Sequence, residues 1–291
     1  MYFEGPAGIV LPIVIFLAGL ALGSFLNVVI YRLPREGLGL ARPRRSFCPH
    51  CQQPLSWSDN IPLFGWLRLR GRCRHCRAPI SFRYPLVELM AAILALSLYS
   101  IEGISPRFFI YYYFVLALTA IAFIDLELMV IPNQLVYPTY LLGFIGALVS
   151  PDPRLPGAYF WDKFIMAGAS PRLVSLLGGV AGFLLGFFFL FLVSRGYKLW
   201  RGRKGMGDGD PPLLGLIGLF LGWAAVPPVA LLATILGLLA VIALASGGKL
   251  KEARAEELAL KPIAFGPFLA LAAVIWYLYG REIMAWYQGF F

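Results

Sequence analysis

The sequence predicts an all-α polytopic membrane protein with about eight transmembrane helices and a small zinc-binding loop domain after the first helix. Of the 291 residues, 59% are hydrophobic and only 14% are charged, and the mean hydropathy is +0.76. These values are more apolar than a soluble domain of this size would carry. Apolar runs of spanning length recur along the chain, and all four cysteines lie between the first two runs.

The expected helices follow from these apolar runs, because a span needs about 20 mostly apolar residues. The first run is long enough to span and others follow it, so we interpret it as a membrane helix and not as a signal peptide. The stretch 211–245 is too long for one span, and Pro227-Pro228 stands in its middle, so we expect a helical hairpin that breaks there. The predicted helices are 8–31, 86–102, 108–124, 133–150, 172–194, 211–226, 229–245 and 263–280.

The basic residues predict the orientation, because cytoplasmic loops of membrane proteins collect Lys and Arg. Eleven arginines from Arg32 to Arg83 face only Glu36 and Asp59, which predicts a cytoplasmic loop and a periplasmic N-terminus. Alternation then places both termini and segment 151–171 outside. The basic residues of the cytoplasmic loops account for the net charge of +10, so no nucleic-acid partner is expected. The later basic residues expected inside are Arg195, Lys198, Arg201, Arg203, Lys204, Lys249, Lys251, Arg254 and Lys261.

Three regions are expected on this basis: a first membrane helix (1–31), a four-cysteine domain (32–84) and a seven-helix core (85–291). No internal repeat stands out in the sequence. The lipid bilayer is the expected environment of the first and third regions.

The cysteines form two CxxC pairs, which is the spacing of a structural zinc site. A disulfide is the alternative, but a cytoplasmic loop lies in a reducing compartment. His50 and His75 lie inside the two pairs and are not expected to be ligands, because four thiolates complete the set. The expected ligands are Cys48, Cys51, Cys73 and Cys76, and the residues expected to pack around the ion are Trp57, Ile61, Pro62, Leu63, Phe64 and Trp66.

Carboxylates at the ends of spanning segments are functional candidates, because charge is costly in a membrane. Asp125 follows the third apolar run, and Asp208 and Asp210 precede the sixth, all on the predicted cytoplasmic side. Two carboxylates that share a site divide into a protonated acid and an ionised base, which is the arrangement that hydrolyses a peptide with water. A helix cap and a boundary residue are the alternatives. Glu127 and Asp208 are expected to be solvated neighbours.

Several motifs in this order resemble the bifunctional type IV prepilin leader peptidases and N-methyltransferases over nearly the whole chain. They include both CxxC pairs, the Asp125 segment with Ile131-Pro132, and the glycine-rich segment that begins at Gly205. The others are GSFLNVVIYRLP at 23–34, NIP at 60–62, RYPLVE at 83–88 and FGP at 265–267.

The resemblance implies that one catalytic aspartate is Asp125 and that the second ends a GxGD motif. Two registers are present, ending at Asp208 or at Asp210. Family members often read Gly-Met-Gly-x-Gly-Asp before an apolar run that ends in Gly-x-x-x-Gly-Trp, and this pattern selects Asp210. The chain departs from the family at Pro212, where many members carry Lys.

The resemblance also implies the reactions and the location. Such enzymes of the bacterial inner membrane remove the leader from type IV prepilins and type II secretion pseudopilins at the cytoplasmic face. They then methylate the new N-terminus with S-adenosylmethionine. The residues themselves contain no glycine-rich dinucleotide-type fingerprint, so the methyl donor rests on the resemblance alone.

Two other functions fit parts of the sequence. A GxGD intramembrane protease of the presenilin or signal-peptide-peptidase kind would share the aspartates, but the cysteine loop argues against it. A transporter could use Asp125 and Asp210 as proton or cation sites. It would be expected to contain inverted repeats and helices broken at mid-membrane, whereas these aspartates are predicted at one face.

Overall fold

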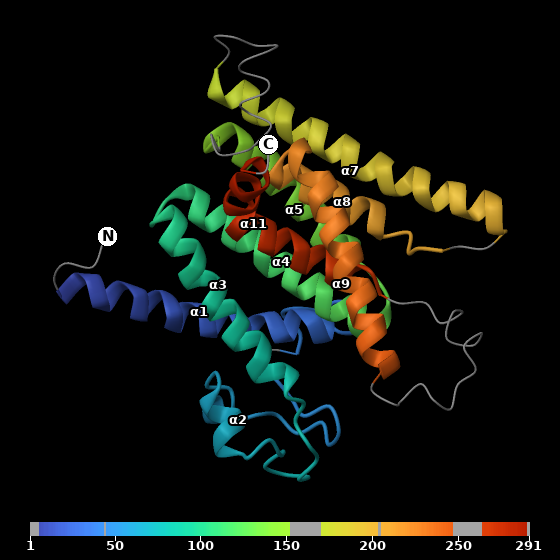
Figure 1. The fold of residues 1–291 in the computed structure, drawn as a ribbon. Helices are drawn as coiled ribbons and strands as arrows, with labels where there is room; N and C mark the ends of the chain where they lie inside the picture. The colour runs from blue at the N-terminus through green and yellow to red at the C-terminus, as the bar shows by residue number, and fades with distance from the viewer. Residues whose placement is uncertain (1–5, 44, 152–169, 203–204, 247–263, 290–291) are drawn as a thin grey trace. The chain divides into compact units, whose positions relative to one another are not determined.

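The structure is a computed structural model that describes residues 6–43, 45–151, 170–202, 205–246 and 264–289 (Figure 1). Within these ranges the regular structure is helical, apart from two isolated β-bridges, which confirms the all-α prediction. The chain divides into two compact units, Met1–Ala120 and Ile121–Phe291, and α4 contributes to both. The helices are α1 (Pro6–Arg32), η1 (Trp57–Asp59), α2 (Phe64–Arg68), α3 (Arg83–Glu102), α4 (Pro106–Leu128), α5 (Asn133–Val149), α7 (Pro171–Arg201), α8 (Asp210–Leu221), η2 (Trp223–Ala225), α9 (Val226–Ser246) and α11 (Gly266–Gln288).

In the described ranges, 6 helices are long and apolar enough to cross a membrane, so the protein is a multi-pass membrane protein. The predicted number of eight is not confirmed. Two of the predicted spans correspond to α5 and α8. With 17 residues α5 is at the lower limit of the roughly 17–25 residues of a membrane span, and α8 is shorter, with 12. The six candidate spans are Ile9–Arg32, Arg83–Glu102, Pro106–Leu128, Pro171–Arg201, Trp223–Ala243 and Gly266–Trp286.

The first unit is built on close packing of α1 against α3. At Gly23 of α1 a Cβ would lie 2.6 Å from the Cα of Glu88, so only glycine lets the two backbones approach this closely. The start of α4 joins the pair through Tyr112, whose hydroxyl donates a 3.0 Å hydrogen bond to the carbonyl of Ala91. The Tyr112 hydroxyl is thus satisfied by a neighbouring helix, as a lipid environment requires.

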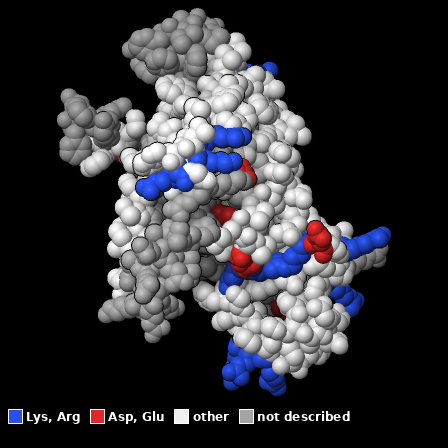
Figure 2. Space-filling model, turned by 90° about the vertical axis from the view of Figure 1, so that its right-hand side faces the viewer, with Lys and Arg blue, Asp and Glu red and all other residues white. Residues whose placement is uncertain are grey.

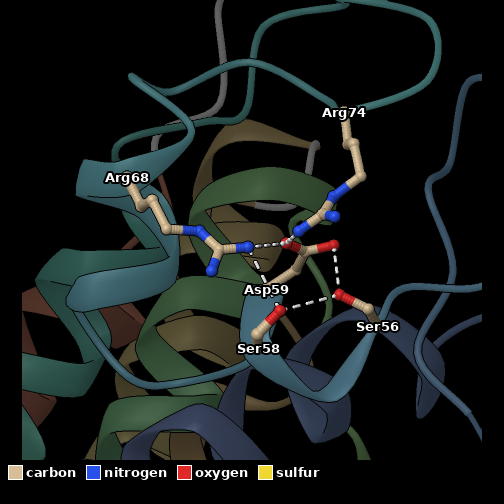
Figure 3. A network of polar contacts seen from close by, with 5 residues as sticks. All are labelled: Ser56, Ser58, Asp59, Arg68 and Arg74. Atoms are coloured by element: carbon tan, nitrogen blue, oxygen red, sulfur yellow. Dashed lines mark hydrogen bonds and ion pairs between the residues drawn. The ribbon is translucent and has the colours of Figure 1, made fainter.

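The loop between α1 and α3 is organised by Asp59, at the end of η1 (Figure 3). Its carboxylate accepts hydrogen bonds from Arg68 of α2 (3.3 Å), from Arg74 in the second cysteine pair (2.5 Å) and from the hydroxyl of Ser56 (2.8 Å). Burial raises the pKa of Asp59, but the hydrogen bonds from Arg74 and Ser56 outweigh it and hold this pKa below its usual value. Asp59 therefore links η1, α2 and one of the cysteine turns.

The second unit contains a glycine contact between α7 and α8. At Gly182 of α7 a Cβ would lie 2.1 Å from the carbonyl oxygen of Gly218 in α8, and the same distance separates a Cβ at Gly218 from the carbonyl oxygen of Gly182. The two backbones therefore touch directly. The rest of α8 is almost entirely buried, so this short helix lies inside the unit and begins at Asp210.

The predicted break between the sixth and seventh helices was placed at the wrong residues. We expected it at Pro227-Pro228, but α8 ends at Leu221, and Gly222 turns the chain with a φ of +79°. Both prolines lie in the first turn of α9, where a missing backbone N–H breaks no helical hydrogen bond. Glycine in the left-handed region, and not proline, thus separates the two helices.

Other predicted ends differ by a few residues. The helix that carries Asp125 continues to Leu128, so the aspartate lies in its last turn and not after it. The helix predicted to end at Ser194 continues to Arg201 and therefore includes Arg195 and Lys198. The predicted outer segment, apart from its ends, lies outside the described residues, as do Arg203, Lys204, Lys249, Lys251, Arg254 and Lys261.

Candidate active site and metal centre

Asp125 lies in the last turn of α4 and is only 5% exposed. The backbone N–H of Gly266, at the start of α11, donates a 3.0 Å hydrogen bond to Asp125 Oδ2. A Cβ at position 266 would lie 2.6 Å from the same oxygen, so glycine is required for this approach. The end of α4 and the start of α11, separated by 141 residues in the sequence, therefore meet at one carboxylate.

The chain turns sharply after α4 at Met129, whose φ of +56° lies in the left-handed region. Its N–H donates to the carbonyl of Asp125 at 2.8 Å and closes the helix. Two residues later, Ile131 lies close to two glycines. A Cβ added at Gly209 would be 2.7 Å from the Cβ of Ile131, and a Cβ added at Gly266 would be 3.4 Å from the Cδ1 of Ile131. Ile131 thus fills the space between the two glycine segments that hold the aspartates.

Asp210 is the first residue of α8 and is 4% exposed. Its Oδ2 accepts a 3.0 Å hydrogen bond from the N–H of Gly207. The side chain of Ile131 lies beside Gly209, which precedes Asp210, and beside Gly266, which donates to Asp125, so both carboxylates are near this side chain. Asp208 and Glu127 are exposed, as the sequence predicts for solvated neighbours.

Tyr140 was not singled out in the sequence. Its hydroxyl, on α5, donates a 2.6 Å hydrogen bond to the carbonyl of Pro212 in the first turn of α8. Its ring lies edge-on to Phe183 of α7, with 5.3 Å between the ring centroids. A tyrosine in an apolar run is a weak signal, but a hydroxyl there needs a partner, and this one fixes the turn that carries Asp210.

The four cysteines form a cluster that could hold a metal ion. Their sulfur atoms all lie within 4.8 Å of one another, and Cys48 Sγ and Cys76 Sγ are 3.8 Å apart. A tetrahedral zinc with Zn–S bonds of about 2.3 Å requires sulfur atoms about 3.8 Å apart, so the cluster fits that ion. All four are described residues, and none forms a disulfide. His50 and His75 are exposed and do not belong to the cluster.

The two cysteine turns have the same backbone geometry. In each, the residue after the second cysteine has a φ of +60° and donates to the carbonyl of the first cysteine: Gln52 to Cys48 at 2.9 Å and Arg77 to Cys73 at 3.1 Å. An isolated antiparallel bridge closes each turn, Phe47 with Pro54 and Arg72 with Pro79. The loop therefore contains a short internal repeat that the sequence reading missed.

Charge in the cluster also favours a cation. Backbone hydrogen bonds from Cys76 and His75 lower the pKa of Cys73 to about 7. The backbone N–H of Ala78 lowers the pKa of Cys76, but burial and the neighbouring thiols raise it to about 11. The Cys73 thiol therefore loses its proton readily, whereas the neighbouring thiols oppose loss of the proton from Cys76. Four thiolates so close together require a positive ion among them.

The expected apolar packing around the ion is only partly present. Trp66 is packed, since its Nε1–H donates to the carbonyl of Ile80 at 3.1 Å and its ring lies edge-on to Phe82. Trp57 is 82% exposed and Phe64 is 54% exposed, so the prediction that these two pack inward was wrong. The hydrogen bonds of Arg68 and Arg74 to Asp59, and not an apolar core, stabilise this part of the loop.

Comparisons with known proteins cover almost the whole chain. A family model described as the bacterial peptidase A24 N-terminal domain matches residues 17–101, and one described as the type IV leader peptidase family matches residues 112–242. Three curated relatives carry the name prepilin leader peptidase/N-methyltransferase. The relative from Aeromonas hydrophila is 37% identical, and the alignment covers 94% of this chain and 92% of the relative. The relative from Pectobacterium carotovorum is 37% identical over 88% of each chain. The relative from Burkholderia pseudomallei is 35% identical over 91% of this chain and 84% of the relative. No solved structure matches the chain.

Proposed function

This chain belongs to the type IV leader peptidase family, and on that premise we propose that Asp125 and Asp210 are the two carboxylates that cleave prepilins. The family and the relatives make it a prepilin leader peptidase and N-methyltransferase of the membrane. The geometry around Ile131 carries the assignment of the pair. The two aspartates are buried, each accepts a hydrogen bond from a glycine N–H, and Ile131 lies beside both glycine segments.

The pair can hydrolyse a peptide without a covalent intermediate on the enzyme. The ionised carboxylate takes a proton from water while the water oxygen bonds to the scissile carbonyl carbon. The protonated carboxylate donates a hydrogen bond to the carbonyl oxygen as negative charge develops there. The C–N bond then breaks, and the leaving nitrogen receives a proton to become the amine of the new N-terminus.

The glycine N–H groups suit both roles. A hydrogen bond from Gly266 stabilises the ionised form of Asp125, and one from Gly207 does the same for Asp210. Either carboxylate can therefore carry the negative charge, while mutual repulsion keeps a proton on the other. The base and the acid can exchange roles as the proton moves during the reaction.

We place the enzyme in the bacterial inner membrane with the active site towards the cytoplasm and both termini in the periplasm. This orientation requires α5 and α8 to cross the membrane in addition to the six candidate spans. The support is the arginine-rich loop between α1 and α3, together with Arg195, Lys198 and Arg201 near the end of α7. Figure 2 shows that the Lys and Arg side chains form a few groups on a surface that is otherwise mostly uncharged.

The substrates that this assignment implies are type IV prepilins and type II secretion pseudopilins, and the methyl donor is S-adenosylmethionine. Structural zinc is assigned to Cys48, Cys51, Cys73 and Cys76, whose sulfur spacing fits it. The cysteine domain corresponds to residues 32–84, after the first helix (1–31), and the peptidase core to 85–291.

The test is co-expression of the full chain with a candidate prepilin, followed by mass measurement of the pilin N-terminus. The parent is expected to remove the leader and to add one methyl group. Asp125→Asn and Asp210→Asn, each at parental expression, are expected to leave the leader in place. Leader removal by either variant would overturn the assignment of the pair.

A further inference from the structure

Four large apolar residues stand on the surface of the loop between α1 and α3: Trp57, Ile61, Phe64 and Leu67, which we call the apolar tip. Trp57 is 82% exposed, Leu67 64% and Phe64 54%. In water such a group of side chains would promote aggregation. Exposed apolar patches therefore mark surfaces that contact a partner or a membrane. The apolar tip lies on η1 and α2 and on the turn between them, beside the start of α3 (Figure 1).

The depth of the tip relative to the membrane helices is fixed by one hydrogen bond. The backbone N–H of Leu63, immediately before α2, donates to Glu88 Oε2 at 2.8 Å. Glu88 follows Arg83, the first residue of α3, by five residues, which is about 7.5 Å along the helix. A basic residue at the start of a spanning helix, such as Arg83, is expected in the headgroup layer, which is roughly 5–7 Å thick on each side of the bilayer. On this basis we expect Leu63 near the boundary between headgroups and acyl chains.

The polar atoms at this level are directed inward. Glu88 is buried and accepts the Leu63 N–H, and Asn27 of α1 donates to the carbonyl of Tyr84 at 3.0 Å. Leu63 makes its contact with a φ of +60°, a conformation that a leucine adopts only where its surroundings impose it. The backbone at Leu63 thus turns towards α3, while the large apolar side chains on either side of it remain exposed.

The neighbouring surface indicates what covers the tip. Phe25 of α1, two residues after the Gly23 that packs on Glu88, is 53% exposed, and Leu89 of α3 is exposed next to Glu88. On spanning helices such side chains face lipid, so lipid-facing residues occur within two positions of Gly23 and Glu88, the residues that meet at the level of Leu63. Exposed Arg68 and Arg70 follow Leu67 directly, as basic residues flank segments that lie in an anionic headgroup layer.

We propose that the apolar tip inserts into the membrane leaflet on the loop's side, with acyl chains of anionic phospholipid as its partner. Trp57 lies at the interface, where tryptophan is enriched, and Phe64 and Leu67 reach about 5–10 Å into the boundary region. The loop then belongs partly to the membrane and is not wholly an aqueous domain. The inference rests on the first unit alone and is independent of which aspartates are catalytic.

The experiment uses the full, zinc-loaded chain in bilayers of phosphatidylcholine and phosphatidylglycerol. A nitroxide is attached through a keto amino acid at position 64 or 67, which leaves the cysteines untouched, and the matched control carries it at exposed His50. Relaxation by oxygen, which concentrates in lipid, is compared with relaxation by a water-soluble nickel chelate. At Phe64 and Leu67 oxygen is expected to be several-fold more effective relative to the control.

Two results would overturn the proposal. Preference for the nickel chelate at both tip positions would place the tip in water, and protection from both reagents would mean that protein covers it, either this chain or a second copy. Zinc content checks the fold of each labelled variant. If both labels disturb it, quenching of the parent by brominated lipids, compared with Trp57→Phe, decides: equal quenching contradicts insertion.

Discussion

Gly266 donates its backbone N–H to Asp125 Oδ2 across 3.0 Å, and no larger residue fits this contact, because a Cβ would lie 2.6 Å from the same oxygen. Gly266→Ala should therefore displace the carboxylate or the start of α11. A misplacement of about 1 Å can lower a rate roughly 100-fold. We expect cleavage of purified prepilin to fall by that order while the helical content stays parental.

Gly237→Ala is the matched control for this prediction. A Cβ at Gly237 of α9 would meet nothing closer than 3.5 Å, so that variant should cleave at about the parental rate. Equal rates for the two variants would mean that the contact at Asp125 does not matter for catalysis.

The register of the glycine motif is tested by three substitutions. Asp125→Asn and Asp210→Asn keep size and polarity but remove proton exchange, so each should leave prepilin uncut, and the double variant should be no worse. Asp208→Asn, at an exposed residue, should stay within roughly tenfold of the parent, since a nearby solvated charge contributes about 1 kcal/mol. An inactive Asp208→Asn beside an active Asp210→Asn would assign catalysis to the upstream register.

Tyr140→Phe removes one hydroxyl and its 2.6 Å hydrogen bond to Pro212. A hydrogen bond of this kind contributes about 0.5–1.5 kcal/mol, so cleavage should fall roughly two- to tenfold without being abolished. Tyr137→Phe, on the exposed side of the same helix, is the control and should be neutral. Complete loss with Tyr140→Phe would indicate that the hydroxyl itself takes part in the reaction.

One zinc per chain is expected after purification under reducing conditions without chelators. Cys48→Ser combined with Cys73→Ser removes one ligand from each turn and should release it, as measured by metal analysis. Zinc that persists in the double variant, or a parent with almost none, would contradict the assignment of the ion.

The two activities are expected to be separable, because the peptidase carboxylates lie at helix ends that have no evident part in methyl transfer. Asp125→Asn, given a pre-cleaved pilin and S-adenosylmethionine, should still methylate the free amine, as mass measurement would show. Absence of methylation in a folded Asp125→Asn protein would count against this separation.

Hydropathy located the membrane helices because a span is a local property of about 20 consecutive residues. The helix break was misplaced because two prolines fit the first turn of α9 and the actual break depends on the φ of Gly222. Asp125 and Asp210 stood out as rare charges in apolar surroundings. Gly266 and Tyr140 did not, since their partners lie 141 and 72 residues away and no local pattern records such contacts.

The cysteine loop was also predicted only in part. Spacing alone identified the four cysteines that cluster. The same reading placed Trp57 and Phe64 around the ion, because an apolar residue in a sequence does not reveal whether protein or lipid will cover it. The contact of Leu63 with Glu88, which joins residues 25 positions apart, is likewise not evident in the sequence.

The contact between Gly182 and Gly218 sets a mechanical limit on the enzyme. Two backbones that touch with no side chain between them cannot slide past each other without a clash, so the register of α7 and α8 is fixed to less than the width of a methyl group. Asp210, at the first residue of α8, inherits that rigidity. If Asp210 is one of the catalytic pair, a leader peptide of different sequence is expected to bend its own backbone towards this carboxylate.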